Sequence, residues 1–378
     1  MHRYPGGTDR APCPGTGQRD NTSAAGLVAS APMTPVFCGV IHHLRGDDVY
    51  ASRGNGIYIS EDRGDTWRHL VSIPLHPLLR LKSCTQLTQR LFRCGVHHIA
   101  CCADRVLVVI AFHRIYHYDL RRDALHTAAD LVGSRPLSLC AVNDTLLFYG
   151  EYSGRRRGGL GRIFMSDDRG VTWEPVYRFT GVRHIHGVYH DPYTDAVWVT
   201  TGDADGESGI WVTDDRFRSV RRVIGGSQQA RAVQLLFTEH HVYFGSDAPR
   251  QKNHLYRISR RDPVPEMLRE VDGPVFYGCR AGGGLFFSTV VEPGKEDREG
   301  SACVWASVDG ERWERLARFP KDRWHMRLFQ YGQVLFPSGD NTTDHLFLTP
   351  FATDRSMTGL RLDLKEVFHR GMQRHGNA

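Results

Sequence analysis

The sequence contains no apolar run of about 18 residues or more, the length that a membrane-spanning helix requires, so we expect a soluble protein with no membrane partner. The first 32 residues are rich in Pro, Gly, Ser and Thr and hold no secretory hydrophobic region. No stretch of Lys and Arg with interleaved aromatics is present, which argues against nucleic acid as a partner. Helical periodicity is missing outside residues 75–92. These absences favour a mainly β protein.

The nine cysteines include no C-x-x-C pair, and most of them fall within apolar runs, where Cys behaves as a small buried hydrophobe. This pattern favours a reducing compartment, so we expect a cytoplasmic location, with secretion as the alternative. Cys84 and Cys94 lie in one loop and are the only pair for which a bridge is considered.

The charge balance indicates an anionic partner. The net charge is +6 with 20 histidines in addition, and 40% of the residues are hydrophobic, which is enough for a core. Nucleic acid, an acidic lipid surface and an acidic sugar all suit a basic protein. We expect an acidic oligo- or polysaccharide, and the oligomeric state is left open.

One short motif occurs three times between apolar runs. Two full copies span residues 60–67 and 166–173 and read Ser-x-Asp-x-Gly-x-Thr-Trp, and a shortened copy spans residues 307–313. Asp binds turn N–H groups, Gly adopts positive φ and Thr-Trp begins a return strand, so each copy predicts a β-hairpin. We expect Asp62, Asp168 and Asp309 to brace turns rather than to catalyse.

The motif resembles the Asp-box, or BNR, repeat of sialidase-like β-propellers. This resemblance implies a propeller whose boxes lie at the periphery of the blades. It covers the repeat frame and not the site, because the Arg-Ile-Pro motif that true sialidases carry ahead of the first box is not found between Thr34 and Ser60.

Weaker copies of the strand before the motif extend the repeat to seven units. An aromatic residue marks each unit, at intervals of about 42 to 58 residues: Tyr58, Tyr116, Phe164, Trp211, Tyr256, Trp305 and Phe347. The first strands are expected near Phe37, Val96, Leu137, His184, Ala232, Val275 and Met326. We predict an all-β fold, a seven-bladed β-propeller with four-stranded antiparallel blades. Residues 1–33 would be a disordered leader, 34–368 the propeller and 369–378 a C-terminal tail.

Loop lengths indicate the working face. Connections between second and third strands are expected to be long from the third unit onwards, over residues 150–161, 201–209, 246–254, 290–301 and 337–344. In a propeller these loops emerge where the innermost strands begin. They should therefore ring one mouth of the central channel, and long loops on a rigid scaffold commonly carry function.

Polar residues on these loops and strands form the candidate site. The catalytic candidates are Tyr277, Glu151, Glu207, Asp203, Asp247, His184 and His186. The substrate-binding candidates are Arg183, Gln228, Gln229, Arg231, Asn253, His254, Arg280, His325, Arg327 and Tyr152. Arginines suit a carboxylate, which the guanidinium group binds through two parallel hydrogen bonds.

Three functions fit these residues, and an enzyme that acts on an acidic carbohydrate is favoured. The first is a glycoside hydrolase without a cofactor. Resemblance to sialidases implies an arginine clamp (Arg231, Arg280 and Arg327), a nucleophilic pair of Tyr277 with Glu151 or Glu207, and Asp203 or Asp247 as the acid.

The second function is a lyase on uronate-containing glycans. Seven-bladed propellers such as the oligogalacturonate lyases use His and Gln around a divalent metal. Here His184, His186 and His254 are the alternative metal ligands, with Gln228 and Gln229 beside them. The third function is a non-catalytic propeller that binds a glycan or a protein. Hydrolysis is placed slightly ahead of elimination.

Overall fold

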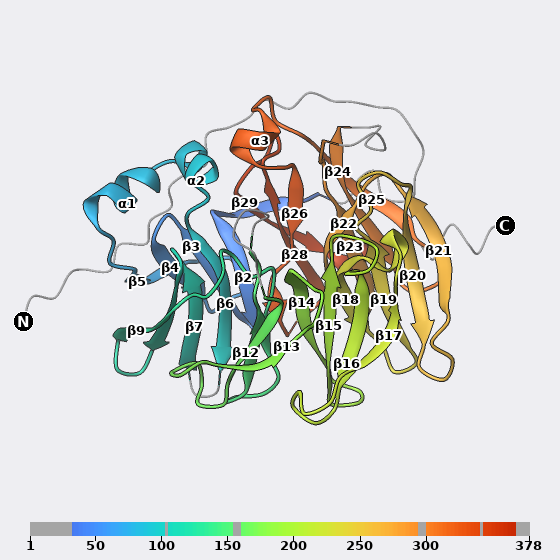
Figure 1. Cartoon of the computed structure of the whole chain (residues 1–378). Coiled ribbons are helices and arrows are strands. Elements are labelled where there is room, and N and C mark those ends of the chain that lie inside the picture. Colours follow the sequence, from blue (N-terminus) through green and yellow to red (C-terminus); the bar gives the residue numbers. More distant parts are fainter. Residues whose placement is uncertain (1–31, 103–104, 154–159, 294–299, 341–342, 368–378) are drawn as a thin grey trace, which may run out of the picture.

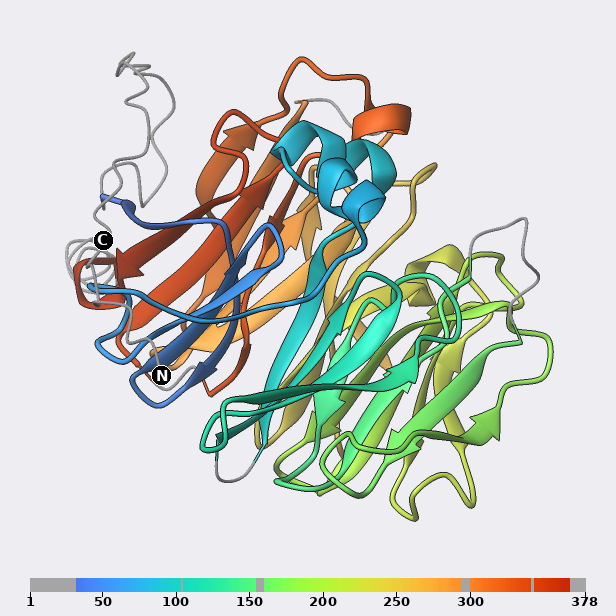
Figure 2. The same ribbon diagram turned by 90° about the vertical axis from the view of Figure 1, so that its left-hand side faces the viewer.

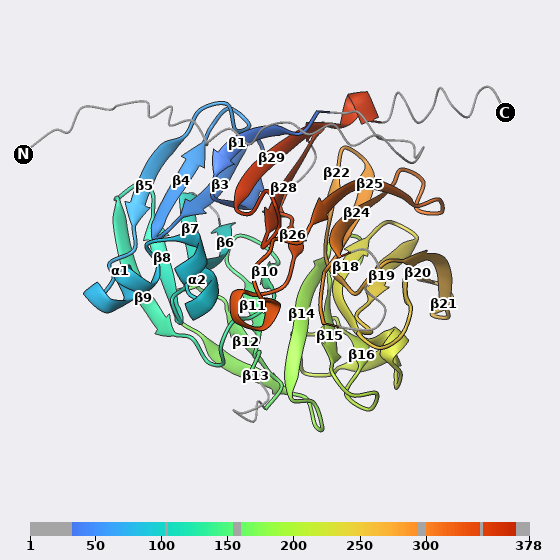
Figure 3. The same cartoon turned by 90° about the horizontal axis from the view of Figure 1, so that it is seen from above.

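The computed structural model describes residues 32–102, 105–153, 160–293, 300–340 and 343–367. Seven antiparallel sheets surround a central channel, and the prediction of a seven-bladed β-propeller with four-stranded blades is confirmed (Figures 1 and 3). The expected leader lies outside the described residues apart from Pro32 and Met33, and the expected tail lies wholly outside them.

Six blades are built from four consecutive strands each, which alternate in direction from the axis outwards. Blades 1 to 3 contain β2 (Val40–Arg45), β3 (Asp48–Arg53), β4 (Gly56–Ser60), β5 (Arg68–Ser72); β6 (Val96–Cys102), β7 (Val106–Ala111), β8 (Arg114–Asp119), β9 (Ala124–Asp130); β10 (Leu139–Ala141), β11 (Leu147–Gly150), β12 (Arg162–Ser166) and β13 (Glu174–Arg178). Blades 4 to 6 contain β14 (His184–Asp191), β15 (Ala196–Gly202), β16 (Gly209–Thr213), β17 (Arg221–Gly225); β18 (Ala232–Phe237), β19 (His241–Ser246), β20 (Asn253–Ser259), β21 (Pro265–Val271); β22 (Val275–Ala281), β23 (Gly284–Thr289), β24 (Ser301–Ser307) and β25 (Glu314–Pro320).

The seventh blade closes the ring with strands from both ends of the described chain. From the axis outwards it contains β26 (Gln333–Leu335), β28 (His345–Phe351), β29 (Thr358–Asp363) and β1 (Thr34–Cys38). β1 pairs antiparallel with β29, with Thr34 opposite Arg361. The chain continues from β1 of blade 7 into β2 of blade 1, so this shared segment links the last blade to the first and closes the ring.

The closure corrects three predictions. Phe37 lies on β1, the outermost strand of blade 7, and not on the innermost strand of blade 1. Met326 begins a helix, and Phe347 lies on a second strand instead of a third. The sequence reading assigned four consecutive strands to every unit, whereas the last blade takes its fourth strand from the beginning of the chain.

The second-to-third-strand loops of blades 3 to 6 lie where they were predicted. The loop at 337–344 does not, because it joins the innermost strand β26 to β28 and so leaves the opposite end of the blade. Part of it, β27 (Ser338–Gly339), pairs in parallel with the end of β2.

The predicted turn motif forms at the hairpin between the third and fourth strands. In the copy at 166–173, the Asp168 carboxylate accepts from the Thr172 N–H at 2.9 Å and from the Thr172 hydroxyl at 2.6 Å, while the Gly170 N–H donates to Ser166. Gly170 has φ of +83°, and a Cβ on it would meet Val108 of blade 2 at 2.5 Å. The motif therefore braces its own hairpin and packs it closely against the preceding blade.

Blade 4 contains a fourth copy that the sequence reading missed. Asp215 accepts from the Ser219 N–H at 2.9 Å, and the Phe217 N–H donates to Thr213 at 3.1 Å. Phe217, with φ of +69°, replaces the glycine, and neither Thr nor Trp follows it. The hydrogen bonds of the turn are kept although four of the five signature residues are replaced, Ser by Thr213 and Thr by Ser219 among them.

Three helices lie on one side of the ring (Figures 1 and 2). α1 (Pro77–Lys82) and α2 (Gln86–Phe92) join blades 1 and 2, as the periodicity of 75–92 predicted, and α3 (Met326–Phe329) joins blades 6 and 7. Cys84 and Cys94 are both free thiols, so the considered bridge is absent. Among the described residues no helix has the length and apolarity that crossing a bilayer requires.

Candidate functional site

The innermost strands all begin on the side that carries the three helices. The reason is that each outermost strand ends there and leads, directly or through α1, α2 or α3, into the next innermost strand. The loops between second and third strands leave the same side. We call this opening of the channel the helix-side mouth and the other opening the far mouth. His184 begins β14 and Asp203 follows β15, so both lie at the helix-side mouth.

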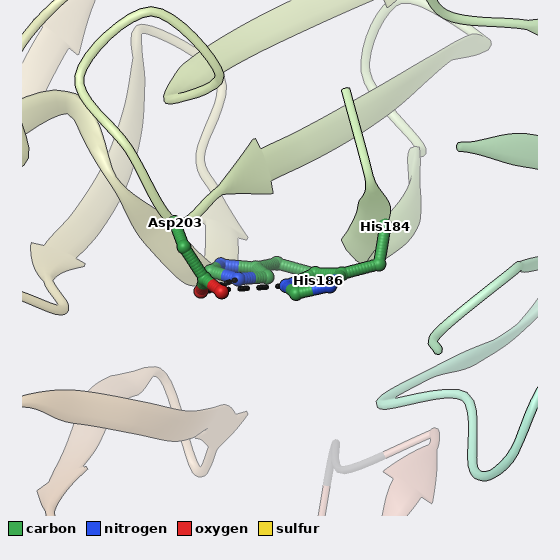
Figure 4. Close-up of side chains that lie close together, drawn as sticks. All are labelled: His184, His186 and Asp203. Atoms are coloured by element: carbon green, nitrogen blue, oxygen red, sulfur yellow. Dashed lines mark ion pairs between the residues drawn. The ribbon is translucent and has the colours of Figure 1, made fainter. Parts of the chain in front are cut away.

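His184, His186 and Asp203 form a compact cluster (Figure 4). The Nε2 atoms of His184 and His186 lie 3.3 Å and 3.5 Å from Oδ1 of Asp203. The two imidazole rings project to the same side because the residues are two apart on one strand, and their centroids are 5.3 Å apart. One ligand atom from each of the three residues lies within 4.8 Å of the others, which suits a metal ion.

Hydrogen bonding fixes the orientation of His186. Its Nδ1 lies 3.0 Å from the carbonyl oxygen of Ala232, which can only accept, so Nδ1 carries a proton. Burial lowers the pKa of His186, which favours the neutral ring and leaves a lone pair on Nε2 directed at the Asp203 carboxylate. The buried Nε2 of His184 makes no well-aligned hydrogen bond either, although it lies 3.3 Å from the same carboxylate. A cation between these atoms would accept the lone pairs of both Nε2 atoms and balance the charge of the carboxylate. The donor set therefore fits a divalent metal.

Arg231 bridges two carboxylates at this mouth. Its NH2 atom lies 3.1 Å from Asp203 and 2.9 Å from Asp247. Burial raises the pKa of Asp247 well above its usual range. Burial acts in the same direction on Asp203, but its polar neighbours, Arg231 among them, outweigh it and hold that pKa below its usual range. One acid is therefore biased towards the neutral form and the other towards the ionised form.

Arg183 and Glu207 support the loop that carries Asp203. Arg183 donates from Nε to Glu207 at 2.8 Å, and its NH2 atom lies 3.4 Å from Asp203. The backbone N–H of Asp203 donates to Glu207, and Gln228 donates to the Asp203 carbonyl oxygen at 2.9 Å. Arg183, Glu207 and Gln228 thus fix the position of the Asp203 carboxylate.

Arg135 is a site residue that the sequence reading missed. It precedes β10, lines the same cavity, and donates to Gln330 at 3.1 Å, but it has no acidic partner among the described residues. Burial lowers its pKa. Its charge acts on Tyr152, whose ring lies 4.5 Å from that of His184. An arginine just ahead of the innermost strand recurs in blades 3, 4 and 5, and that recurrence was the available signal.

The predicted pairing of Tyr277 with a glutamate is wrong. The Tyr277 hydroxyl donates to Gln333 at 3.4 Å, whereas Glu151 pairs with Arg162 at 2.8 Å and Glu207 with Arg183. Burial raises the pKa of Tyr277 to about 12, so at neutral pH it is a neutral hydroxyl with no carboxylate to activate it.

The predicted arginine clamp is not assembled either. Arg280 lies near the end of β22 and donates to the Tyr193 hydroxyl at 2.6 Å, which places it at the far mouth. Over six residues a strand extends about 20 Å, so Arg280 is well separated from Arg231. Arg327 and His325 are exposed on α3 and at its N-terminus, not on an innermost strand as predicted.

His254, the third alternative metal ligand, does not join the His184 cluster. Its Nδ1 lies 3.3 Å from Gln229, which also accepts from Tyr256 at 2.9 Å. Asn253 donates to the Ala248 carbonyl oxygen and braces the loop after β19. Asp203 takes the third position beside the two histidines, a role the sequence reading did not give it.

The site opens into a cavity of about 1300 Å³ that runs along the channel. Its lining includes His186, Asp203, Arg231 and Asp247 beside Arg135 and Tyr152, and residues of the far mouth such as Arg280. The volume exceeds that of an ordinary small-ligand pocket, so an oligosaccharide can be accommodated.

No protein-family model matches this chain, and no curated protein matches it in sequence. Solved structures do resemble it. An oligogalacturonate lyase in complex with manganese has a TM-score of 0.58 at 10% identity, covering 89% of this chain and 91% of its own. The oligogalacturonate lyase of Vibrio parahaemolyticus gives the same TM-score and identity, covering 89% and 92%.

A complex with a peptide is nearly as similar. YCF48 bound to D1 peptide has a TM-score of 0.55 at 12% identity, covering 88% of this chain and 94% of its own. A lyase and a peptide-bound protein thus share the architecture. The comparisons establish the propeller fold, and function has to be argued from the site.

Proposed function

We propose that this protein is a lyase that cleaves an acidic, uronate-containing glycan at the helix-side mouth, with a divalent metal held by His184, His186 and Asp203. The observation that carries the proposal is the orientation of the two histidines: His186 carries its proton on Nδ1, the buried Nε2 of His184 makes no hydrogen bond, and both Nε2 atoms lie within 3.5 Å of one carboxylate. When bound, the metal would supply a Lewis acid that withdraws charge from the substrate carboxylate.

Arg135 completes the recognition of the carboxylate. It lines the cavity, has no acidic partner among the described residues, and acts electrostatically on both Tyr152 and His97. A guanidinium with unused donors is suited to bind a carboxylate through two hydrogen bonds. Neutralising that carboxylate acidifies the neighbouring C–H, which is the requirement for β-elimination.

His97 is the candidate base and Tyr152 the candidate acid. Burial, together with repulsion from Arg135, lowers the pKa of His97 well below its ordinary value, so the ring is neutral; a substrate carboxylate paired with Arg135 would weaken that repulsion and make the ring a stronger base. Burial raises the pKa of Tyr152 to about 12, so its hydroxyl is protonated at neutral pH. His97 takes the proton α to the carboxylate, the C–O bond at the β-carbon breaks, a C=C bond forms, and Tyr152 protonates the leaving oxygen.

Hydrolysis of an acidic glycan is the second candidate. It is favoured by the opposite shifts of Asp203 and Asp247 around Arg231, since such a pair supplies a neutral acid and an ionised base. The products distinguish the reactions: elimination yields an unsaturated sugar that absorbs in the ultraviolet, and hydrolysis yields a saturated reducing end.

The test compares His186→Ala with His190→Ala, which removes a histidine near the far end of the same strand. Manganese binding is measured by calorimetry, and activity is measured on oligogalacturonate, alginate and sialyl oligosaccharides. We expect the parent and His190→Ala to bind manganese and to form unsaturated product, and His186→Ala to do neither. Saturated product would favour hydrolysis. Ligand binding without any product would identify a binding propeller.

A further inference from the structure

The three helices beside the helix-side mouth carry a cluster of exposed apolar side chains. Of the eleven large hydrophobic residues exposed among the described residues, five lie on these short helices: Leu78, Leu81, Leu91, Phe92 and Leu328. α1 has no buried residue at all, and Leu78 and Leu81 are 64% and 68% exposed. Helices of a globular protein normally bury their apolar side chains, so this arrangement indicates an external partner.

The same helices carry unpaired positive charge. No Asp or Glu occurs between Ile73 and Val96. Five exposed cations lie on or beside the helices, and none forms an ion pair with a described residue: Arg80, Lys82, Arg93, Arg323 and Arg327. Asp322, which lies shortly before α3, is already paired with Arg90 and Lys321. The surface is therefore both apolar and basic.

Contacts between the helices make this one surface. The Lys82 ammonium lies 5.1 Å from the centre of the Phe92 ring and links α1 to α2. Arg90 of α2 is buried, donates to the Phe329 carbonyl oxygen of α3 at 2.7 Å, and pairs with Asp322. Figure 2 shows α1 and α2 next to α3 above the blades. We call this surface, formed by α1, α2 and α3, the helical platform.

We propose that the helical platform docks on an anionic lipid bilayer. Exposed leucines with Arg and Lys beside them suit the membrane interface, where apolar side chains enter the acyl boundary and cations remain among the headgroups. Among the described residues of the platform helices themselves no Asp or Glu occurs, which favours attraction to an anionic leaflet. The platform lies on the side of the helix-side mouth, so docking would bring the site close to the membrane surface. The absence of an apolar run long enough to span a bilayer led us to expect no membrane partner, but interfacial docking needs no such run.

Sedimentation with vesicles tests this proposal. Phosphatidylcholine vesicles are compared with vesicles of phosphatidylcholine and phosphatidylglycerol, using the full chain. We expect binding to the anionic vesicles only, weakened by salt. Arg80→Glu with Lys82→Glu should weaken binding by at least about fivefold for each cation removed, and Leu78→Ser with Leu81→Ser should also weaken it.

The matched control is Val264→Ser with Arg312→Glu, two exposed residues in turns on the side of the far mouth. These changes should leave vesicle binding unaltered. The proposal is overturned if the parent does not bind anionic vesicles, or if the control weakens binding as much as the platform variants do. An acidic protein partner for the platform would then be the alternative. Glycan cleavage in free solution is measured separately, so failure of docking is distinguishable from failure of the proposed lyase activity.

Discussion

Replacing Arg231 with Leu should leave Asp247 as an uncompensated buried carboxylate. Asp203 keeps Arg183 and the two histidines as neighbours, but Arg231 is the only ion-pair partner of Asp247 among the described residues. The side chain of Asp247 is only 2% exposed, and its Oδ1 has no hydrogen-bond partner. Breaking a buried pair on one side typically costs about 3 to 5 kcal/mol of unfolding free energy.

The cost should depend on pH. Burial already raises the pKa of Asp247, and loss of Arg231 should raise it further. A carboxyl whose pKa is raised in the folded state binds its proton more tightly there than in the unfolded chain. Its destabilising effect is therefore small below the ordinary pKa of Asp and grows as pH rises towards the folded-state value. Arg231→Leu should lose about 3 kcal/mol at mildly alkaline pH and clearly less at mildly acidic pH.

Urea unfolding of the parent, Arg231→Leu and Arg231→Leu with Asp247→Asn measures this effect. We expect the Asn substitution to restore most of the lost stability and to remove its added pH dependence, since no buried charge remains. Equal destabilisation of the single and double variants, with the same pH profile, would refute the reasoning, because the cost would then come from lost packing of the arginine side chain.

Three further predictions concern the turn motif, the closure and the carboxylate site. Asp168→Ala should lower the unfolding free energy by about 1 to 2 kcal/mol, with exposed Asp167→Ala as the near-neutral control. Hydrogen bonds from Thr172 outweigh burial and lower the pKa of Asp168, so the stabilisation by Asp168 should be lost as pH falls through that lowered pKa. Urea unfolding that shows the same stabilisation at low pH would contradict this prediction. Gly39→Ala should destabilise the junction of β1 and β2, because its Cβ would meet the Ser52 carbonyl oxygen at 2.2 Å, whereas Gly46→Ala, which meets nothing within 4 Å, should cost clearly less in the same assay. Arg135→Lys should raise KM for an acidic oligosaccharide by at least about tenfold with little change for its methyl ester, and equal effects on the two substrates would argue against carboxylate recognition by Arg135.

The repeat was predictable because most blades carry an aromatic residue at the same place in their own sequence. Six of the seven aromatic markers lie on the third strand of a blade, from Tyr58 on β4 to Trp305 on β24. The closure was not predictable in this way, since pairing of β1 with β29 leaves no local signature. The hairpin of Asp215 was missed for another reason: its hydrogen bonds persist although Gly, Thr and Trp of the motif have been replaced.

The site was predictable only in part. His184 and His186 were found from their spacing, and Asp203 from its loop. Which partners they take depends on how neighbouring blades converge, and that depends on the ring. Arg280 illustrates the difficulty: it occupies an innermost strand, as predicted, but near the end that opens at the far mouth. Assigning a residue to an innermost strand does not by itself predict at which mouth of the channel its side chain lies.

The most direct test of the account is the ultraviolet absorbance of oligogalacturonate incubated with the parent protein and manganese. We predict absorbance from an unsaturated product, which disappears on chelation, returns when manganese is restored, and is absent in His186→Ala but present in His190→Ala. Saturated products that form equally well in the presence of a chelator would contradict a metal-assisted elimination at His184, His186 and Asp203.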